Sequence, residues 1–125
     1  MTLLLNAQTT FKGDKMSNLL VSEADVEEAM NWLARNDEPM AQAHADVEKY
    51  DELKKVTIAE LMNLSGKSSA KSQEAEALAS QEYRQFLEER AAVTKKYIQL
   101  KLRASYLNTR IDVWRTVQAN IRRTV

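Results

Sequence analysis

The chain has 125 residues, no cysteine, two glycines and one proline, and its acidic and basic side chains balance to zero net charge. The lack of cysteine excludes disulfides, thiolate metal ligands and thiol nucleophiles, and fits a reducing compartment. So few glycines and prolines exclude a β fold with many tight turns, whereas long helices are typical of this Ala-, Glu-, Lys- and Leu-rich composition.

The charges are distributed unevenly along the chain. Residues 22–93 hold sixteen acidic against eight basic side chains, whereas residues 94–125 hold eight basic side chains and one acid, Asp112. This split indicates either two segments of the chain that match each other or a basic surface for an acidic partner.

Residues 1–21 are expected to be a disordered tail, because no apolar periodicity is sustained there. Codons for residues 12–15 can spell a bacterial ribosome-binding site just ahead of Met16. Two interpretations stay open: translation begins at Met16, or the segment is an ordinary flexible tail. A single helical domain is expected over 22–125.

A first helix is predicted to begin at Ser22 and to stop near Arg35. Ser22 is a favourable N-cap, and Asp25 stands three residues later, where a capping box places its acid. The apolar stripe of this helix consists of Val26, Ala29, Met30 and Leu33, with Trp32 at its edge.

A second helix is predicted after a break at residues 36–39 and runs to about Leu64. Pro39 suits the first helical position, where its missing N–H is not needed. Gly66 is placed to end the helix in the left-handed conformation. The apolar face consists of Met40, Ala43, Val47, Tyr50, Leu53, Thr57, Leu61 and Leu64.

A third helix is predicted to begin between Ser69 and Gln73 and to continue to the end of the chain, over roughly 50 residues without glycine or proline. Its apolar positions alternate spacings of four and three residues, which is the pattern of a coiled coil. The predicted seam consists of Ala79, Tyr83, Phe86, Arg90, Val93, Tyr97, Leu100, Ala104, Leu107, Ile111, Trp114, Gln118 and Ile121.

These elements predict an all-α fold, a long antiparallel helical hairpin or coiled coil with a first arm broken into two helices and a continuous second arm. The acidic first helix is expected to lie beside the basic second half of the third helix and to pair with most of its cations. Apolar side chains left over predict a homodimer and a protein interface. The candidate interface residues are Leu102, Val113, Trp114, Val117 and Ile121.

Catalytic and metal sites are not expected. His44 is the only histidine, and it cannot supply the paired Glu-x-x-His motifs of a bundle metal site. No nucleophile, base and orienting group are placed together, and two glycines cannot form a phosphate loop. We therefore expect no enzymatic activity, no cofactor, no small-molecule substrate and no membrane association.

Direct binding of single-stranded DNA is an alternative function, because cations can neutralise phosphates and aromatic rings can stack on unpaired bases. The candidate residues are Lys95, Lys101, Arg103, Arg110, Arg115, Arg122 and Arg123. In a third alternative, which the negative charge of residues 22–93 suggests, the acidic face of the first two helices mimics DNA and inhibits a DNA-acting defence enzyme of a host.

The C-terminal half resembles small helical proteins of tailed bacteriophages. The resemblance rests on residues 72–83 (SQEAEALASQEY), on Asp112-Val113-Trp114-Arg115 and on residues 119–123 (ANIRR), and covers about the last 55 residues. Genes of these proteins tend to lie beside early recombination and replication genes. The resemblance implies a phage accessory protein that binds a protein partner in DNA recombination or replication in the host bacterial cytoplasm, and it supplies no binding residues.

Overall fold

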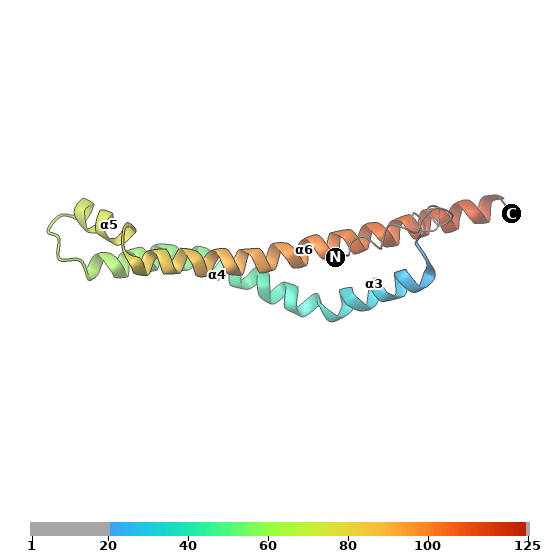
Figure 1. Ribbon diagram of the computed structural model, residues 1–125, viewed down its shortest axis with the longest axis horizontal. Helices are drawn as coiled ribbons and strands as arrows, with labels where there is room; N and C mark the ends of the chain where they lie inside the picture. The colour runs from blue at the N-terminus through green and yellow to red at the C-terminus, as the bar shows by residue number, and fades with distance from the viewer. Residues whose placement is uncertain (1–20, 125) are drawn as a thin grey trace, which may run out of the picture. The chain divides into compact units, whose positions relative to one another are not determined.

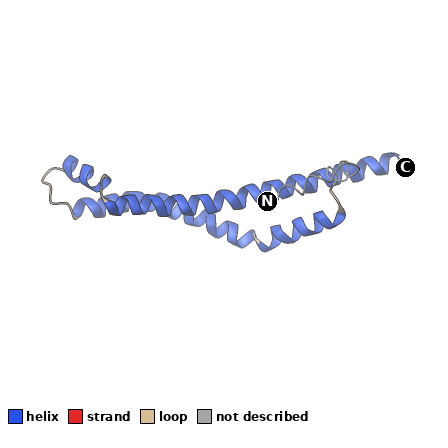
Figure 2. Cartoon of the chain, in the orientation of Figure 1, coloured by secondary structure: helices blue, strands red, loops and turns tan. Residues whose placement is uncertain are grey.

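The computed structural model describes residues 21–124. Within them it contains four α-helices and no strand (Figures 1 and 2). The helices are α3 (Glu23–Arg35), α4 (Asp37–Asn63), α5 (Ala70–Leu78) and α6 (Gln81–Thr124). The predicted all-α class with a long C-terminal helix is therefore confirmed. The predictions for Met16 and for the N-terminal tail, Val21 excepted, lie outside the described residues.

The described residues form two compact units. Among them, unit 1 combines residues 21–35 with residues 103–124, and unit 2 comprises Asn36–Leu102. Helix α6 contributes to both units. The single domain expected over 22–125 stays a prediction.

The capping box predicted at the start of α3 is present. The Ser22 hydroxyl accepts a hydrogen bond from the Asp25 N–H, and the Ser22 N–H donates to Asp25 Oδ2, each at 3.1 Å. These bonds satisfy backbone groups that have no partner within the helix. The helix ends at Arg35, as predicted.

The break between the first two helices is shorter than predicted. Only Asn36 separates α3 from α4, because α4 already begins at Asp37. Pro39 is therefore the third residue of α4 and not the first. The helix tolerates it there because N–H groups of the first turn have no intrahelical acceptor.

The prediction of a left-handed glycine after α4 is wrong. No described glycine has a positive φ, and Leu64 caps the helix in the right-handed region at φ −88° and ψ −3°. Side chains hold the connection instead: the Ser65 hydroxyl donates to the Glu76 carboxylate and accepts from the Lys67 N–H at 3.1 Å. Helix α5 packs against α4.

The predicted third helix is interrupted near its start. Helix α5 ends at Leu78, and α6 begins at Gln81 and has 44 residues. The Ser80 hydroxyl accepts from the Tyr83 N–H at 3.1 Å and donates to the Ala77 carbonyl at 2.7 Å. Ser80 thus supplies the cap of a new helix, a role in which serine competes with the regular helical bonds.

The predicted seam of α6 is confirmed between Tyr83 and Gln118, where each of its positions is buried or half-buried, while Ala79 and Ile121 at its ends are exposed. On α4, every position of the predicted face is at least half-buried except Leu64, which is 81% exposed. On α3, Val26 and Ala29 are buried, whereas Met30 is 57% exposed.

Helices α4 and α6 are antiparallel within unit 2. The early α4 residue His44 packs on the late residue Tyr97, with ring centroids 5.0 Å apart. The later Asp51 pairs with the earlier Arg90 at 2.7 Å. Residues of unit 2 that are buried are Ala43, Ala77, Tyr83 and Phe86.

Helices α3 and α6 are antiparallel within unit 1. Asp25, near the start of α3, pairs with Arg110, whereas Trp32 and Arg35 near its end line a hollow together with the earlier α6 residue Arg103. The buried cluster consists of Val26, Ala29, Leu107 and Ile111. The fully buried part of unit 1 is therefore aliphatic, and the half-buried rings of Trp32 and Trp114 pack against it.

Candidate functional site

Two surfaces stand out, one in each unit. The first is the unit-2 apolar face, a row of α6 side chains made up of Leu87, Ala91, Thr94, Ile98 and Leu102. Spacings of three and four residues place them on one side of the helix. Leu87 is 39% exposed, Ile98 46% and Leu102 65%. The row lies beside the seam, and α6 alone lines the shallow groove along it.

The predicted interface residues fall in different environments. Leu102 belongs to the unit-2 apolar face, while Val113 and Ile121 are exposed and Val117 is half-buried in unit 1. Trp114 packs against the buried cluster of unit 1 together with Val21. Helix α3 therefore reaches Trp114, which the sequence analysis counted among the apolar side chains left over. The interface role of these five residues stays a prediction.

The second surface is built around a polar network in unit 1. Arg110 pairs with Asp25 at 3.1 Å and donates a hydrogen bond to the Tyr106 hydroxyl at 2.8 Å. The pKa of Asp25 is lowered, first by the hydrogen bonds from Ser22 and then by the charge of Arg110. The pKa of Arg110 is raised, mainly by its hydrogen bond to Tyr106. Both groups therefore stay ionised near neutral pH.

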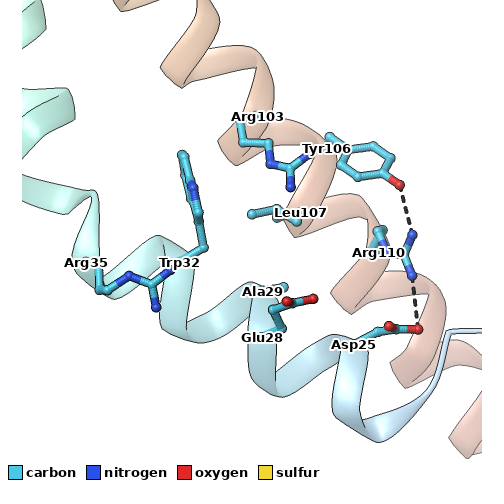
Figure 3. Close-up of a pocket in the computed structure, with 9 residues that line it drawn as sticks. All are labelled: Asp25, Glu28, Ala29, Trp32, Arg35, Arg103, Tyr106, Leu107 and Arg110. Carbon is cyan, nitrogen blue, oxygen red and sulfur yellow. Dashed lines mark hydrogen bonds and ion pairs between the residues drawn. The ribbon is translucent and has the colours of Figure 1, made fainter. Parts of the chain in front are cut away.

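Beside this network lies the unit-1 hollow, a cavity of about 260 Å³ that is shown in Figure 3. The Arg103 guanidinium lies 5.8 Å from the centroid of the Tyr106 ring. Trp32 stands on α3, across the hollow from Arg103 on α6. The lining residues are Asp25, Glu28, Ala29, Trp32, Arg35, Arg103, Tyr106, Leu107 and Arg110.

The sequence analysis expected the first helix to pair with most of the candidate DNA-binding cations, and the structure differs from this expectation. Among the described residues, only Arg110 forms an ion pair with an acid of α3. Arg115 pairs at 3.5 Å with Asp112 of its own helix, and Arg123 donates to Asn120 at 2.6 Å. Short-range partners on the same helix thus replace the predicted interhelical pairs.

The structure brings Arg103 and Arg110 together at the unit-1 hollow, and it places the other cations elsewhere. Lys95 lines the groove of the unit-2 apolar face, and Lys101 lies 5.8 Å from the centroid of the Tyr97 ring. Arg122 is exposed near the end of α6. DNA binding by the full set of cations stays a prediction.

Sequence reasoning did not assign a binding role to Trp32 or Arg35. Both line the hollow, because they follow Ala29 at spacings of three on α3. That spacing could have indicated a shared helix side. What could not be read was the stretch of α6 that this side meets, since it depends on the register of the two helices.

No metal or membrane feature emerges from residues 21–124. His44 lies 3.9 Å from Glu48, and no group of three or more metal-ligating side chains occurs in this part of the chain. None of its helices combines the length and apolar character that a membrane span requires.

No protein-family model, curated protein or solved structure matches this chain. The functional argument therefore rests on its residues and their arrangement.

Proposed function

We propose that the chain is a non-enzymatic binding protein whose unit-2 apolar face docks a second copy of the chain. The observation that carries this proposal is the exposure of Leu87, Ile98 and Leu102, between 39% and 65%, in one row on α6. A row of large apolar side chains is stabilised by removal from water, at about 25 cal/mol per Å² buried. Such rows mark interaction surfaces when they are contiguous.

The charges that accompany this face favour a second copy in antiparallel orientation. Within unit 2, α6 begins with Glu82, Glu88 and Glu89 against Arg84 and Arg90, and Arg90 is already paired with Asp51 of α4. The helix continues with Lys95, Lys96 and Lys101. An antiparallel copy sets the acidic stretch of each helix against the basic stretch of the other. A parallel copy sets like charges together, which costs free energy. An antiparallel pair can be related by a two-fold axis, which is the commonest symmetry of homodimers.

The biological role we propose for this dimer is that of a phage accessory protein that binds a protein of DNA recombination or replication in the host cytoplasm. It is supported by the resemblance of the C-terminal half to such phage proteins. Val113 and Ile121, which are exposed on α6 in unit 1, are apolar side chains available for that partner.

Sedimentation equilibrium over a range of concentrations tests the dimer. The expected result is a mass of twice the 14.3 kDa chain that falls toward one chain on dilution. Ile98→Glu is expected to keep the protein monomeric, because it places a charge in the middle of the row that the dimer would bury.

Val56→Glu is the matched control, because Val56 on α4 is 47% exposed against 46% for Ile98. The control is expected to dimerise like the original chain. Monomeric behaviour of the original chain at every concentration, or equal loss of dimer in both variants, would contradict the proposed interface. Circular dichroism confirms that each variant is helical.

A further inference from the structure

The unit-1 hollow combines flat side chains with guanidinium groups from both of its helices. Trp32 and Arg35 come from α3, and Arg103 and Tyr106 come from α6 (Figure 3). Ala29 of α3 and Leu107 of α6 add an apolar part to the lining of the hollow. The volume of about 260 Å³ lies just below the range of about 300–1,000 Å³ that is usual for whole small-molecule sites. The hollow therefore suits one planar ring with its substituent.

The charges of the hollow are not fully paired. Asp25 and Arg110 neutralise each other through their ion pair. Arg35 and Arg103 remain against Glu28, and no carboxylate of residues 21–124 lies within ion-pair distance of either arginine. One net positive charge is left, which matches the single negative charge of a phosphodiester.

The position of Arg103 is suited to a nucleotide. Its guanidinium lies over the Tyr106 ring, so that it presents a flat cationic surface beside an aromatic one. Unpaired bases stack on aromatic rings and on arginine planes, and arginine N–H groups bind phosphate oxygens in pairs. Tyr106 is 50% exposed and is held by its hydrogen bond with Arg110, so its ring is both accessible and fixed.

We propose that the unit-1 hollow binds one nucleotide of a single-stranded nucleic acid. The base packs between Trp32 and the Arg103–Tyr106 pair, and the phosphate lies at Arg103 with Arg35 at the edge of the site. A base paired inside a duplex cannot enter, because it would first have to leave its stack. The site is independent of the unit-2 apolar face and of dimer formation.

Fluorescence titration with oligo(dT) tests this site. The chain has two tryptophans, so Trp114→Phe leaves Trp32 as the only indole reporter. Binding is expected to quench Trp32 and to weaken as salt rises. Arg103→Gln, made in the same background, is expected to weaken binding about tenfold and to lower the log–log salt slope by about 0.7, the value for one lost phosphate contact on a single strand.

Arg84→Gln is the matched control, because it removes the same charge from the same helix at an exposed residue that neither lines the hollow nor belongs to the candidate DNA-binding cations. It is expected to change affinity less than twofold. Equal losses for the two arginine variants would assign binding to diffuse charge and overturn the site. Absence of Trp32 quenching would also overturn it.

Two further ligands test whether duplex DNA or an acidic peptide quenches Trp32 as well as single-stranded DNA does. Duplex DNA of equal length is expected to bind more weakly, and equal affinity would contradict entry of an unpaired base. Polyglutamate is expected not to quench Trp32, and equal quenching would reassign the hollow to acidic peptides. Ile98→Glu is expected to keep its affinity for oligo(dT), so loss of the dimer and loss of this site can be told apart.

Discussion

The two units use the same helix, α6, with different chemistry. In unit 2, rings dominate the core, and Phe86 lies 5.6 Å from Tyr50 and 6.1 Å from Tyr83 between centroids. In unit 1, the buried cluster of Val26, Ala29, Leu107 and Ile111 is aliphatic. The rings of unit 1 lie at the margin of this cluster: Trp32 and Trp114 are half-buried against it, and Trp32 lines the hollow together with Tyr106. One heptad pattern can therefore support an inert core in one place and a candidate site in another.

The largest expected effect concerns the aromatic core. Phe86→Ala is expected to lower the free energy of unfolding by about 3–5 kcal/mol, because it removes a ring that is 8% exposed and leaves a cavity. Urea denaturation followed by circular dichroism measures this change. Leu64→Ala, at a side chain of unit 2 that is 81% exposed and lies outside the unit-2 apolar face, is the control and is expected to change it far less. Equal effects would contradict the assignment of the core.

Leu107→Ala makes the matching change in unit 1. Leu107 is 6% exposed, and truncating a buried leucine costs about 2–5 kcal/mol, with lower values where neighbours can relax into the space. Hydrogen exchange measured by mass spectrometry is expected to show the loss of protection mainly in α3 and in the α6 residues of unit 1. Loss concentrated in α4 and α5 would contradict a separate unit 1.

The capping box of α3 gives a smaller, pH-dependent effect. Ser22→Ala is expected to cost about 1 kcal/mol, the usual value for loss of a capping hydroxyl. It is also expected to raise the pKa of Asp25 toward its ordinary value of 3.8, because a hydrogen bond that lowers this pKa is lost.

The sign of the pH effect follows from the lowered pKa of Asp25 in the folded chain. The stabilisation is complete well above 3.8 and is lost as pH falls through the folded pKa, which lies below that value. Carbon-detected NMR titration of the Asp25 carboxyl measures its pKa in the original chain and in Ser22→Ala. An Asp25 pKa at or above 3.8 in the original chain would contradict the network.

The smallest expected effect is at Gly66 in unit 2. A methyl group at this position meets no atom within 4 Å, and the backbone φ is not positive. Gly66→Ala is therefore expected to raise the free energy of unfolding by about 0.4–1 kcal/mol, because it restricts the unfolded chain. Thermal denaturation measures this change. A clear loss of stability would restore the left-handed helix end that the sequence suggested.

Much of the fold was predictable because it depends on local pattern. The seam between Tyr83 and Gln118 followed from spacings of three and four, and the Ser22–Asp25 box followed from residue type and distance in sequence. The interruption at Ser80 was missed because no glycine or proline marks it. Ser80, with Glu82 in the first turn that follows, was the available signal.

The candidate site was less predictable because it depends on register. The positive charge of residues 94–125 was visible in the sequence, and its pairing with α3 was expected to be extensive. Arg110 alone forms such a pair within residues 21–124, since Arg115 finds Asp112 on its own helix. Which arginine lies across from Trp32 follows from the relative shift of two helices, and composition does not determine that shift.

The discontinuity of unit 1 in the sequence has a consequence for the order of folding. Unit 2 is one continuous segment, whereas unit 1 joins two segments that are separated by the 67 residues from Asn36 to Leu102. Closing a flexible loop of that length costs about 4 kcal/mol of chain entropy before any contact forms. If unit 2 folds first, its antiparallel helices have already closed that loop. Unit 1 is then expected to form last, after the ribosome has released the C-terminal part of α6.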